Sequence, residues 1–309
     1  TEKLIGVSGT NPGLEDTPAS ADGVLQPPPK PRVYELLLKA VTDKMGIPAV
    51  PMRRAVITQD LDDRKACFYA TGCGRGCSIG AAFQTTTSLL PWAQKTGNMK
   101  LVTDAMVKEV HVDENGRASG VTFVNRLTNE DIRVDADRVI LAASACETAR
   151  LMLNSKSALH PNGLANSSGQ VGRNLMDSLG ADIGGFIPAL KGRPKYNEDG
   201  YSSNHLYIPW WDNAGQKDGT LDFTRGYHFE VGGGFSSPGM GVASRVDGYG
   251  NRAKDEVRDL YGTGINLALR CEMVQSDNCY CEIDEDVKDK WGIPVLKFHW
   301  QWSEQELNQ

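Results

Sequence analysis

The stretch from residue 100 to residue 154 constrains the fold most, because it predicts several strands, a turn and a helix in a definite order. An apolar run over residues 138–142 is typical of a buried strand, and it leads directly into a helix expected over 146–154. Segments with the alternation of strands precede it, and the turn at 114–116 joins two of them. These segments are 100–103, 106–112, 118–125 and 132–134. The order predicts a β-meander, then a strand of a second sheet, then a helix.

The segment before this stretch is irregular at first and then helical. Residues 1–32 are rich in Pro and Gly and predict an extended arm. A helix is expected over 33–45, ending at Gly46, and a second over 81–95, ending at Gly97. The apolar stripe expected on the first helix consists of Leu36, Leu37, Leu38, Ala40, Val41 and Met45.

The second half of the chain predicts an antiparallel sheet. Ile265, Leu267 and Leu269 alternate with polar or small residues, as in a strand that is buried on one face. An amphipathic helix is expected over 252–261. The strands are expected over 181–188, 205–211, 227–231, 265–271, 278–283 and 295–302. The predicted fold class is therefore α+β (mixed α/β).

Composition excludes several classes of protein. The 309 residues carry a net charge of −6 and show no basic stripe, so we expect no nucleic-acid partner. No run of 18 apolar residues predicts a membrane span, and the first residues contain no apolar core of a signal peptide. The seven cysteines are odd in number in a long chain, which does not favour a disulfide scaffold.

Three of the cysteines, Cys67, Cys73 and Cys77, lie within eleven residues in a loop rich in glycine. Thiolates spaced in this way can surround one metal centre, because glycines allow the tight turns that this requires. Free or disulfide-linked thiols are one alternative. A zinc site completed by a histidine is another, although zinc normally takes four ligands and no histidine is near in sequence.

Other polar and aromatic residues leave two interpretations open. His205, His228 and His299 fall on predicted strands, where they either line a sugar pocket or are ordinary strand residues. The same choice, sugar stacking or core packing, applies to Trp210, Trp211, Trp300 and Trp302. Cys279 and Cys281 share one face of a strand, and small buried hydrophobic side chains are the simpler interpretation.

Several blocks of the chain together resemble the glucose–methanol–choline (GMC) flavin oxidoreductases. The strand and helix over residues 138–155 resemble a family block, and 169–177 resembles the family segment VGRNLxDH, with Ser178 where His is common. Residues 289–294 followed by 302–306 resemble the end of the family's substrate-domain sheet. The arm and residues 4–9 are similar to the bacterial branch that oxidises sugars.

The resemblance implies cofactors and site residues. It implies FAD, with contacts from Val107, Ala142, Ala143 and Ser144, where small residues let the backbone approach the cofactor. The cysteine loop resembles the motif of the family's sugar dehydrogenases, in which three cysteines hold a [3Fe–4S] cluster that passes electrons from flavin to a cytochrome. Cys67, Cys73 and Cys77 are the corresponding residues, while a related branch has a fourth cysteine where this chain shows Ala70 or Thr71.

The chain also departs from the family pattern. It contains no GxGxxG sequence, which in the family holds the FAD diphosphate at a helix N-terminus, and it lacks the block with the family's active-site histidine. We therefore expect a chain that resembles the middle of a GMC enzyme, with both ends of the family fold absent and no catalysis in isolation. The expected regions are an arm and cap helix of the substrate region (1–60), a partial FAD-binding domain (61–177) and a substrate domain with an antiparallel sheet (178–309).

The expected activity is that of a dehydrogenase that transfers a hydride from a sugar or polyol to flavin. The expected partners are the small-molecule substrate and a small subunit or cytochrome that accepts electrons, with self-association through an exposed strand edge. The leading expectation for location is the bacterial periplasm, with the cytoplasm as the alternative. Two other functions stay open: an electron-transfer or metal-binding module built on the cysteine loop, and a non-catalytic carbohydrate-binding chain.

Overall fold

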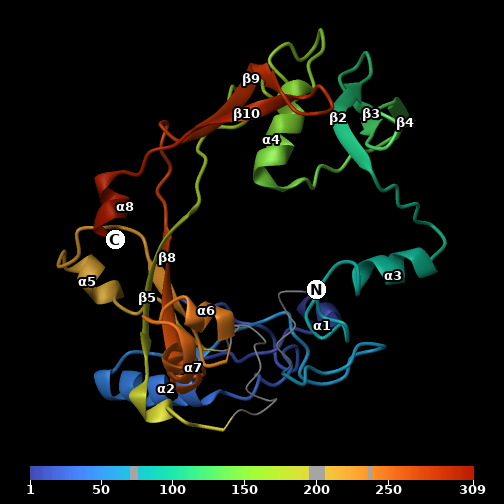
Figure 1. The fold of residues 1–309 in the computed structure, drawn as a ribbon. Coiled ribbons are helices and arrows are strands. Elements are labelled where there is room, and N and C mark those ends of the chain that lie inside the picture. The colour runs from blue at the N-terminus through green and yellow to red at the C-terminus, as the bar shows by residue number, and fades with distance from the viewer. Residues whose placement is uncertain (70–75, 195–205, 236–238) are drawn as a thin grey trace. The chain divides into compact units, whose positions relative to one another are not determined.

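The computed structural model describes residues 1–69, 76–194, 206–235 and 239–309 (Figure 1). The chain divides into two compact units, each discontinuous in sequence. Unit 1 comprises Thr1–Met99, Ser178–Glu272 and Asn308–Gln309, and unit 2 comprises Lys100–Asp177 and Met273–Leu307. The fold mixes helices with antiparallel sheets, as the sequence predicts.

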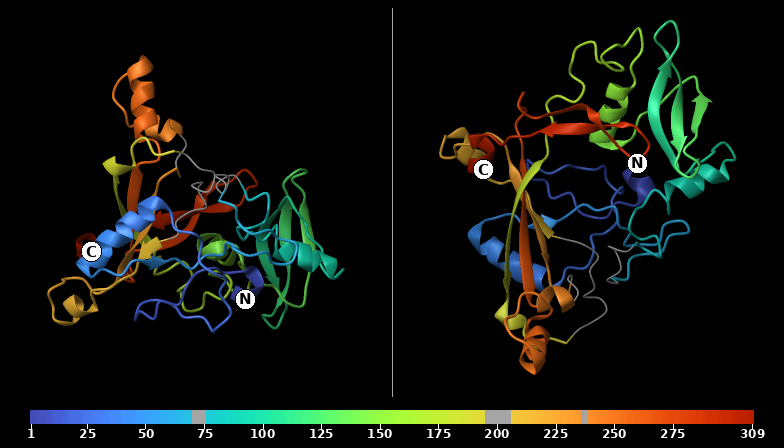
Figure 2. Two further views of the ribbon diagram at one scale, coloured as in Figure 1. Left: turned by 90° about the horizontal axis from the view of Figure 1, so that it is seen from below. Right: turned by 45° about the horizontal axis from the view of Figure 1, so that its top comes forward.

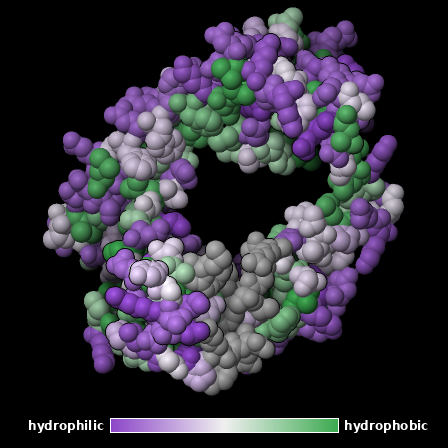
Figure 3. All heavy atoms as spheres, in the orientation of Figure 1, coloured by the Kyte–Doolittle hydropathy of each residue, from purple (hydrophilic) through white to green (hydrophobic). Residues whose placement is uncertain are grey.

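The helices are short, and none in the described ranges is long and apolar enough to cross a membrane. In chain order they are α1 (Glu2–Ile5), α2 (Val33–Met45), α3 (Leu89–Lys95), α4 (Ser144–Asn154), the 3-10 turn η2 (Pro188–Leu190), α5 (Asn213–Lys217), α6 (Gly239–Ala243), α7 (Gly250–Leu260) and α8 (Glu304–Asn308). Charged residues are frequent along α7, and hydrophilic residues dominate the surface where this helix lies in Figure 3.

Unit 1 is built on a five-stranded sheet in which every neighbouring pair is antiparallel. In spatial order the strands are β1 (Val50–Pro51), β6 (Leu206–Ile208), β7 (Tyr227–Gly233), β8 (Gly264–Glu272) and β5 (Ser178–Phe186). The register confirms the alternation expected for β8, because residues 265 and 267 contribute to the core while 266, 268 and 270 point to the opposite face.

Helix α2 packs on the apolar face of this sheet (Figures 1 and 2). Tyr34 is 2% exposed and packs with Leu206, Ile208 and Val231. Glu35 is also buried. Its carboxylate accepts a hydrogen bond from the backbone N–H of Arg32 (2.7 Å), which caps the helix, and another from Leu206 (3.1 Å), which ties the helix to β6.

The bounds of this helix agree with the prediction, including the left-handed Gly46 (φ 71°) that ends it, but of the predicted apolar stripe only Leu38 packs against the core. Leu36, Val41 and Met45 are each more than half exposed. The helix instead turns Tyr34, Glu35 and Thr42 inward, and the buried carboxylate of Glu35 is satisfied there by two backbone donors.

Unit 2 contains the predicted meander and a separate hairpin. The meander consists of β2 (Ala105–Val112), β3 (Ala118–Asn125) and β4 (Asp131–Asp135), and the hairpin consists of β9 (Tyr280–Lys288) and β10 (Pro294–His299). The turn between β2 and β3 is closed by Asp113, whose carboxylate accepts hydrogen bonds from the backbone of Asn115 and Arg117.

Three predicted elements were wrong or too long. Residues 100–103 and 138–142 form no strand, and Ile140 is 90% exposed, because neither run pairs with another strand within the described residues. The helix predicted over 81–95 begins only at Leu89. Residues 81–83 are extended, since Ala82 bridges to Val56 and Phe83 donates its N–H to Ala55, and residues 85–88 form turns.

Candidate functional site

The residues predicted to contact flavin all lie in unit 2, at two places. Val107 is on β2 opposite Phe123, beside a β-bulge at Lys108, and its side chain is 37% exposed. Ala142, Ala143 and Ser144 form the exposed entry to α4. The hydrogen bond that ties α4 to β2 lies at the other end of the helix, where Ser155 accepts from Val110.

The entry to α4 is open to a ligand. Ala143 is the N-cap residue, and no side chain caps the first turn. Ser144 has φ 65°, a left-handed conformation that is strained for a residue other than glycine. The first N–H groups of a helix have no partner within the helix and carry partial positive charge. The exposed backbone at Ala143 and Ser144 can therefore donate hydrogen bonds to an acceptor or anion.

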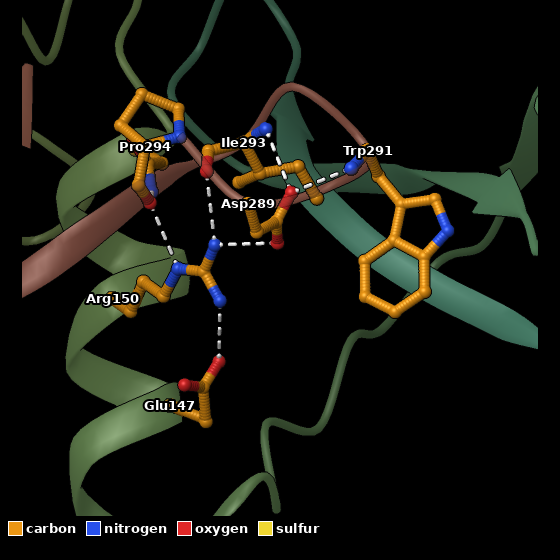
Figure 4. A network of polar contacts seen from close by, with 7 residues as sticks. Glu147, Arg150, Asp289, Trp291, Ile293 and Pro294 are labelled. Carbon is orange, nitrogen blue, oxygen red and sulfur yellow. Dashed lines mark hydrogen bonds and ion pairs between the residues drawn. The ribbon is translucent and has the colours of Figure 1, made fainter. Parts of the chain in front are cut away.

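A buried arginine holds α4 against the turn of the β9–β10 hairpin (Figure 4). Arg150 is 7% exposed, and its guanidinium donates to the backbone oxygens of Pro294 (2.8 Å) and Ile293 (3.1 Å) and to the carboxylate of Asp289 (2.7 Å). It also pairs with Glu147 (3.2 Å), one turn nearer the start of α4. Each of the three guanidinium nitrogens therefore has at least one acceptor.

Asp289 completes this network. One of its oxygens accepts hydrogen bonds from the backbone N–H groups of Trp291 (2.9 Å) and Ile293 (3.1 Å). Burial raises the pKa of Asp289, but the hydrogen bond from Arg150 and those from the backbone outweigh it, so the pKa lies below its usual value. The carboxylate is therefore charged at neutral pH and fixes the turn.

The cysteine loop belongs to unit 1. Cys67 and Cys77 both pack against a small core formed by Val56, Ile57 and Ala81. Their sulfurs accept backbone hydrogen bonds, from Tyr69 at Cys67 (3.3 Å) and from Ala82 at Cys77 (3.4 Å). Hydrogen bonds to sulfur are among the features that tune the potential of iron–sulfur clusters.

Arg64 fixes both ends of this loop. It is 2% exposed and donates to the backbone oxygens of Ile5 (2.8 Å), Gly80 (2.7 Å) and Ala81 (3.2 Å). Burial lowers the pKa of Arg64, and the electrostatic interaction with Cys77 partly offsets this by raising it. The guanidinium therefore lies near Cys77.

Cys73 lies outside the described residues, so the convergence of the three cysteines stays a prediction. Within the described ranges, no three His, Cys, Asp or Glu side chains are grouped so that they could hold a metal ion. Cys281 lies on β9 and Cys279 directly precedes this strand. Both are buried, which confirms the interpretation as small core residues.

The polar face of the unit 1 sheet carries a further constellation. The register aligns Tyr207, Glu230, Ala268 and Asp182 in one row across four strands. The next row contains His228 and Arg270. Because paired residues of antiparallel strands point to the same face, these side chains surround a common surface.

Glu230 lies at the centre of this face. Its carboxylate lies 3.9 Å from the guanidinium of Arg270 and 3.8 Å from the imidazole of His228. Beside it, Asn266 donates to Asp182 (3.4 Å). A cavity of about 610 Å³ is lined by Glu230, Arg270, Asn266 and Asp182, and glycines and Ala268 leave the space for it. We call it the polar-face cavity.

Three histidines and four tryptophans were candidates for this surface. His228 lies on it, and His205 is outside the described residues. His299 was placed wrongly in the same sheet. It lies on β10 in the separate hairpin of unit 2, where it stacks on Tyr280 and contacts Glu282 (2.9 Å). Trp210 and Trp211 join an aromatic cluster with Tyr227, in which Trp211 also packs against the hydrophobic core, and Trp300 and Trp302 are exposed just after β10.

Comparison with known proteins identifies the family. A model described as GMC oxidoreductase matches residues 27–179. The 2-methyl-1,2-propanediol dehydrogenase of Mycolicibacterium austroafricanum is 25% identical over 292 residues, 91% of this chain and 50% of that protein. The fructose dehydrogenase large subunit of Gluconobacter japonicus is 24% identical over 265 residues, 82% of this chain and 45% of that protein. The 6'''-hydroxyparomomycin C oxidase of Streptomyces lividus is 27% identical over 208 residues, 65% of this chain and 37% of that protein.

The chain belongs to the GMC oxidoreductase family. It spans about half the length of the curated relatives that it matches first. The family implies FAD. The uncapped, exposed entry to α4 fits a cofactor that offers hydrogen-bond acceptors, and Ala142 and Ala143 leave room for its approach. This fit concerns one edge of such a cofactor, because the 309 residues contain no GxGxxG sequence for the diphosphate.

Proposed function

We propose that the chain belongs to an FAD-dependent dehydrogenase that oxidises an alcohol group of a sugar or polyol. The polar face of the unit 1 sheet carries this proposal, because Glu230, Arg270, Asn266 and Asp182 offer both donors and acceptors around one cavity. Neutral polyhydroxy compounds are recognised by such mixed sets of groups. The names of two relatives, a propanediol dehydrogenase and a fructose dehydrogenase subunit, agree with this substrate class.

The chain's own residues would bind and orient the reactants. Glu230 accepts hydrogen bonds from substrate hydroxyls, while Arg270 donates to them, so the two fix the orientation of a polyol. The backbone at Ala143 and Ser144 donates to the cofactor, and the bulged strand beside Val107 approaches it. When bound, FAD supplies the chemistry by accepting a hydride from the carbinol carbon.

Binding measured by calorimetry tests the substrate part of this proposal. We expect the purified chain to bind monosaccharides or short polyols, and Glu230→Gln to weaken binding by about 10-fold or more, since a hydrogen bond to a charged group is lost. Asp259→Asn, an exposed change on α7 that removes the same charge, is the matched control. Equal binding by the two variants and the unchanged chain would refute this role of the polar face.

FAD binding and turnover separate the enzyme from a non-catalytic carbohydrate-binding chain. Because the sequence holds no GxGxxG, we expect the 309-residue chain to bind FAD weakly and to reduce no artificial dye with sugars. A protein that contains this chain together with a diphosphate loop should bind FAD tightly and should reduce the dye with sugars. Sugar binding by that protein with no flavin absorbance would favour the non-catalytic alternative.

We also propose that Cys67, Cys73 and Cys77 hold a [3Fe–4S] cluster that passes electrons to a small subunit or cytochrome. The backbone hydrogen bonds to the sulfurs of Cys67 and Cys77, and the nearby Arg64, support this proposal. Anaerobic reconstitution with iron and sulfide should give a paramagnetic signal that Cys73→Ser abolishes. The same signal in both proteins, or none in either, would contradict it and leave a free-thiol or zinc site.

A further inference from the structure

A second cavity, of about 450 Å³, opens in unit 1 next to the polar-face cavity. We call it the Trp210 cavity. Its aromatic wall is formed by Tyr207, Trp210 and Tyr227, and its polar wall includes Asp16 and Asn213. Aromatic rings beside carboxylate and amide groups suit a sugar ring, which has an apolar face of C–H groups and an edge of hydroxyls.

The aromatic wall is held rigidly. Trp210 is 8% exposed and packs edge-to-face on Tyr227, with ring centroids 4.9 Å apart, and on Phe223 at 6.0 Å. Its indole N–H donates to the side-chain oxygen of Asn213. A side chain at position 226 would meet the indole at 3.3 Å, so Gly226 keeps this part of the wall flat.

The polar wall is preorganised by the same asparagine. Asn213 donates its amide to the carboxylate of Asp16 at 2.7 Å, and to that of Glu15 at 3.3 Å. Asp16 lines the cavity and Glu15 does not. A carboxylate has about four acceptor positions, so Asp16 can accept further hydrogen bonds from a ligand.

The two cavities meet at one residue. Arg270 lines both of them, lies 3.9 Å from Glu230 on the polar face, and is paired across the sheet with His228 of the Trp210 cavity. A ligand that extends from Glu230 past Arg270 therefore reaches Asp16 and Trp210 without leaving the protein surface.

From this arrangement we infer that the Trp210 cavity is a second saccharide subsite, so that the substrate has at least two linked sugar rings. This inference rests on the proposed function, because the first ring would occupy the polar-face cavity. The second ring would contact the aromatic wall and donate hydroxyl hydrogen bonds to Asp16. A single sugar ring would fill only the first of these cavities.

Calorimetry with matched ligands tests the second subsite. The one-ring probes are glucose and fructose, and the two-ring probes are maltose, cellobiose and sucrose. We expect at least one two-ring probe to bind about 10-fold more tightly than its component ring, which is what one good hydrogen bond to a charged group or one aromatic contact provides. Asp16→Ala should remove this advantage, while Glu15→Ala should retain it.

Trp210→Phe is the second variant, because it keeps the packing on Tyr227 but loses the indole N–H and part of the ring face. It should also weaken two-ring binding and leave one-ring binding unchanged. Equal affinity for one-ring and two-ring probes would overturn the subsite, and so would a two-ring advantage that survives both Asp16→Ala and Trp210→Phe. In either case, glucose or fructose binding that depends on Glu230 would leave the proposed function standing. No binding of any probe would overturn both.

Discussion

Replacing Asp289 with asparagine tests whether the buried arginine network holds helix α4. The side chains of Arg150 and Asp289 are 9% and 16% exposed, so solvent screens their interaction little. Asparagine keeps an oxygen for the backbone donors of Trp291 and Ile293 but loses the charge that accepts from Arg150 at 2.7 Å. A hydrogen bond to a charged partner contributes about 1.5–3 kcal/mol, and we take about 2 kcal/mol as the loss.

Hydrogen exchange measured by mass spectrometry reports this loss where it acts. If the amides of α4 exchange through an opening that breaks the network, about 2 kcal/mol accelerates their exchange about 30-fold. Asp286→Asn, an exposed substitution on the same strand β9, is the control and should leave the rate unchanged. If α4 exchanges at the same rate in both variants and the unchanged chain, the network does not hold the helix, and our account of Arg150 is wrong.

The same residue makes the stability of unit 2 depend on pH. The pKa of Asp289 is lower in the folded chain than in the unfolded chain, so the folded state binds fewer protons. Its contribution is therefore complete above the unfolded pKa of about 4 and is lost as the pH falls through the folded pKa. Urea midpoints measured from pH 6 to pH 2 should fall more steeply for the unchanged chain than for Asp289→Asn. Parallel curves would show that another carboxylate dominates.

Three further predictions concern the backbone and the surface. Gly172→Ala should destabilise unit 2 by about 2 kcal/mol or more, because the added carbon would lie 2.3 Å from the backbone oxygen of Cys281. In Gly169→Ala the added carbon meets no atom within 4 Å, so this variant should cost only about 1 kcal/mol, and urea midpoints measure both losses. Ser144→Gly should raise the free energy of unfolding by up to about 1 kcal/mol, because it relieves a left-handed serine, and so raise the thermal midpoint slightly; a lower midpoint would contradict that strain. The chain should self-associate at high concentration, and Ile140→Lys should reduce the association in light scattering, while a monomeric unchanged chain would refute the expectation.

Local signals in the sequence predicted the elements that depend on local chemistry. The bounds of α2 follow from the arm that ends at Pro31 and from Gly46, and the hairpin of β2 and β3 follows from the turn at Asn115 and Gly116. In contrast, the run around Ile140 has the composition of a strand but no partner among the described residues. Composition gives the tendency to form a strand, while pairing decides whether one forms.

The candidate site shows the same division. The sequence drew attention to Cys67, Cys77 and His228 because their residue types and spacing are conspicuous. It gave no sign that Arg150 and Asp289 pair, although both lie in blocks that resemble the family, because they are 139 residues apart and meet only in the folded unit. The misplaced His299 has a similar origin, because alternation identified its strand but could not show which sheet contains it. Periodicity carries no information on pairing between distant segments.

The discontinuity of unit 1 has a consequence for synthesis on the ribosome. Val50 on β1 pairs with Tyr207, so roughly 160 residues must be added before β1 finds its neighbour. At about 5–20 residues per second this takes about 8–30 s, during which the meander of unit 2 emerges whole and can fold. Glu35 has a local donor, the N–H of Arg32, throughout this interval, and its second donor arrives only with Leu206. The nascent chain therefore carries α2 already capped, with its inward face exposed, until the later strands cover it.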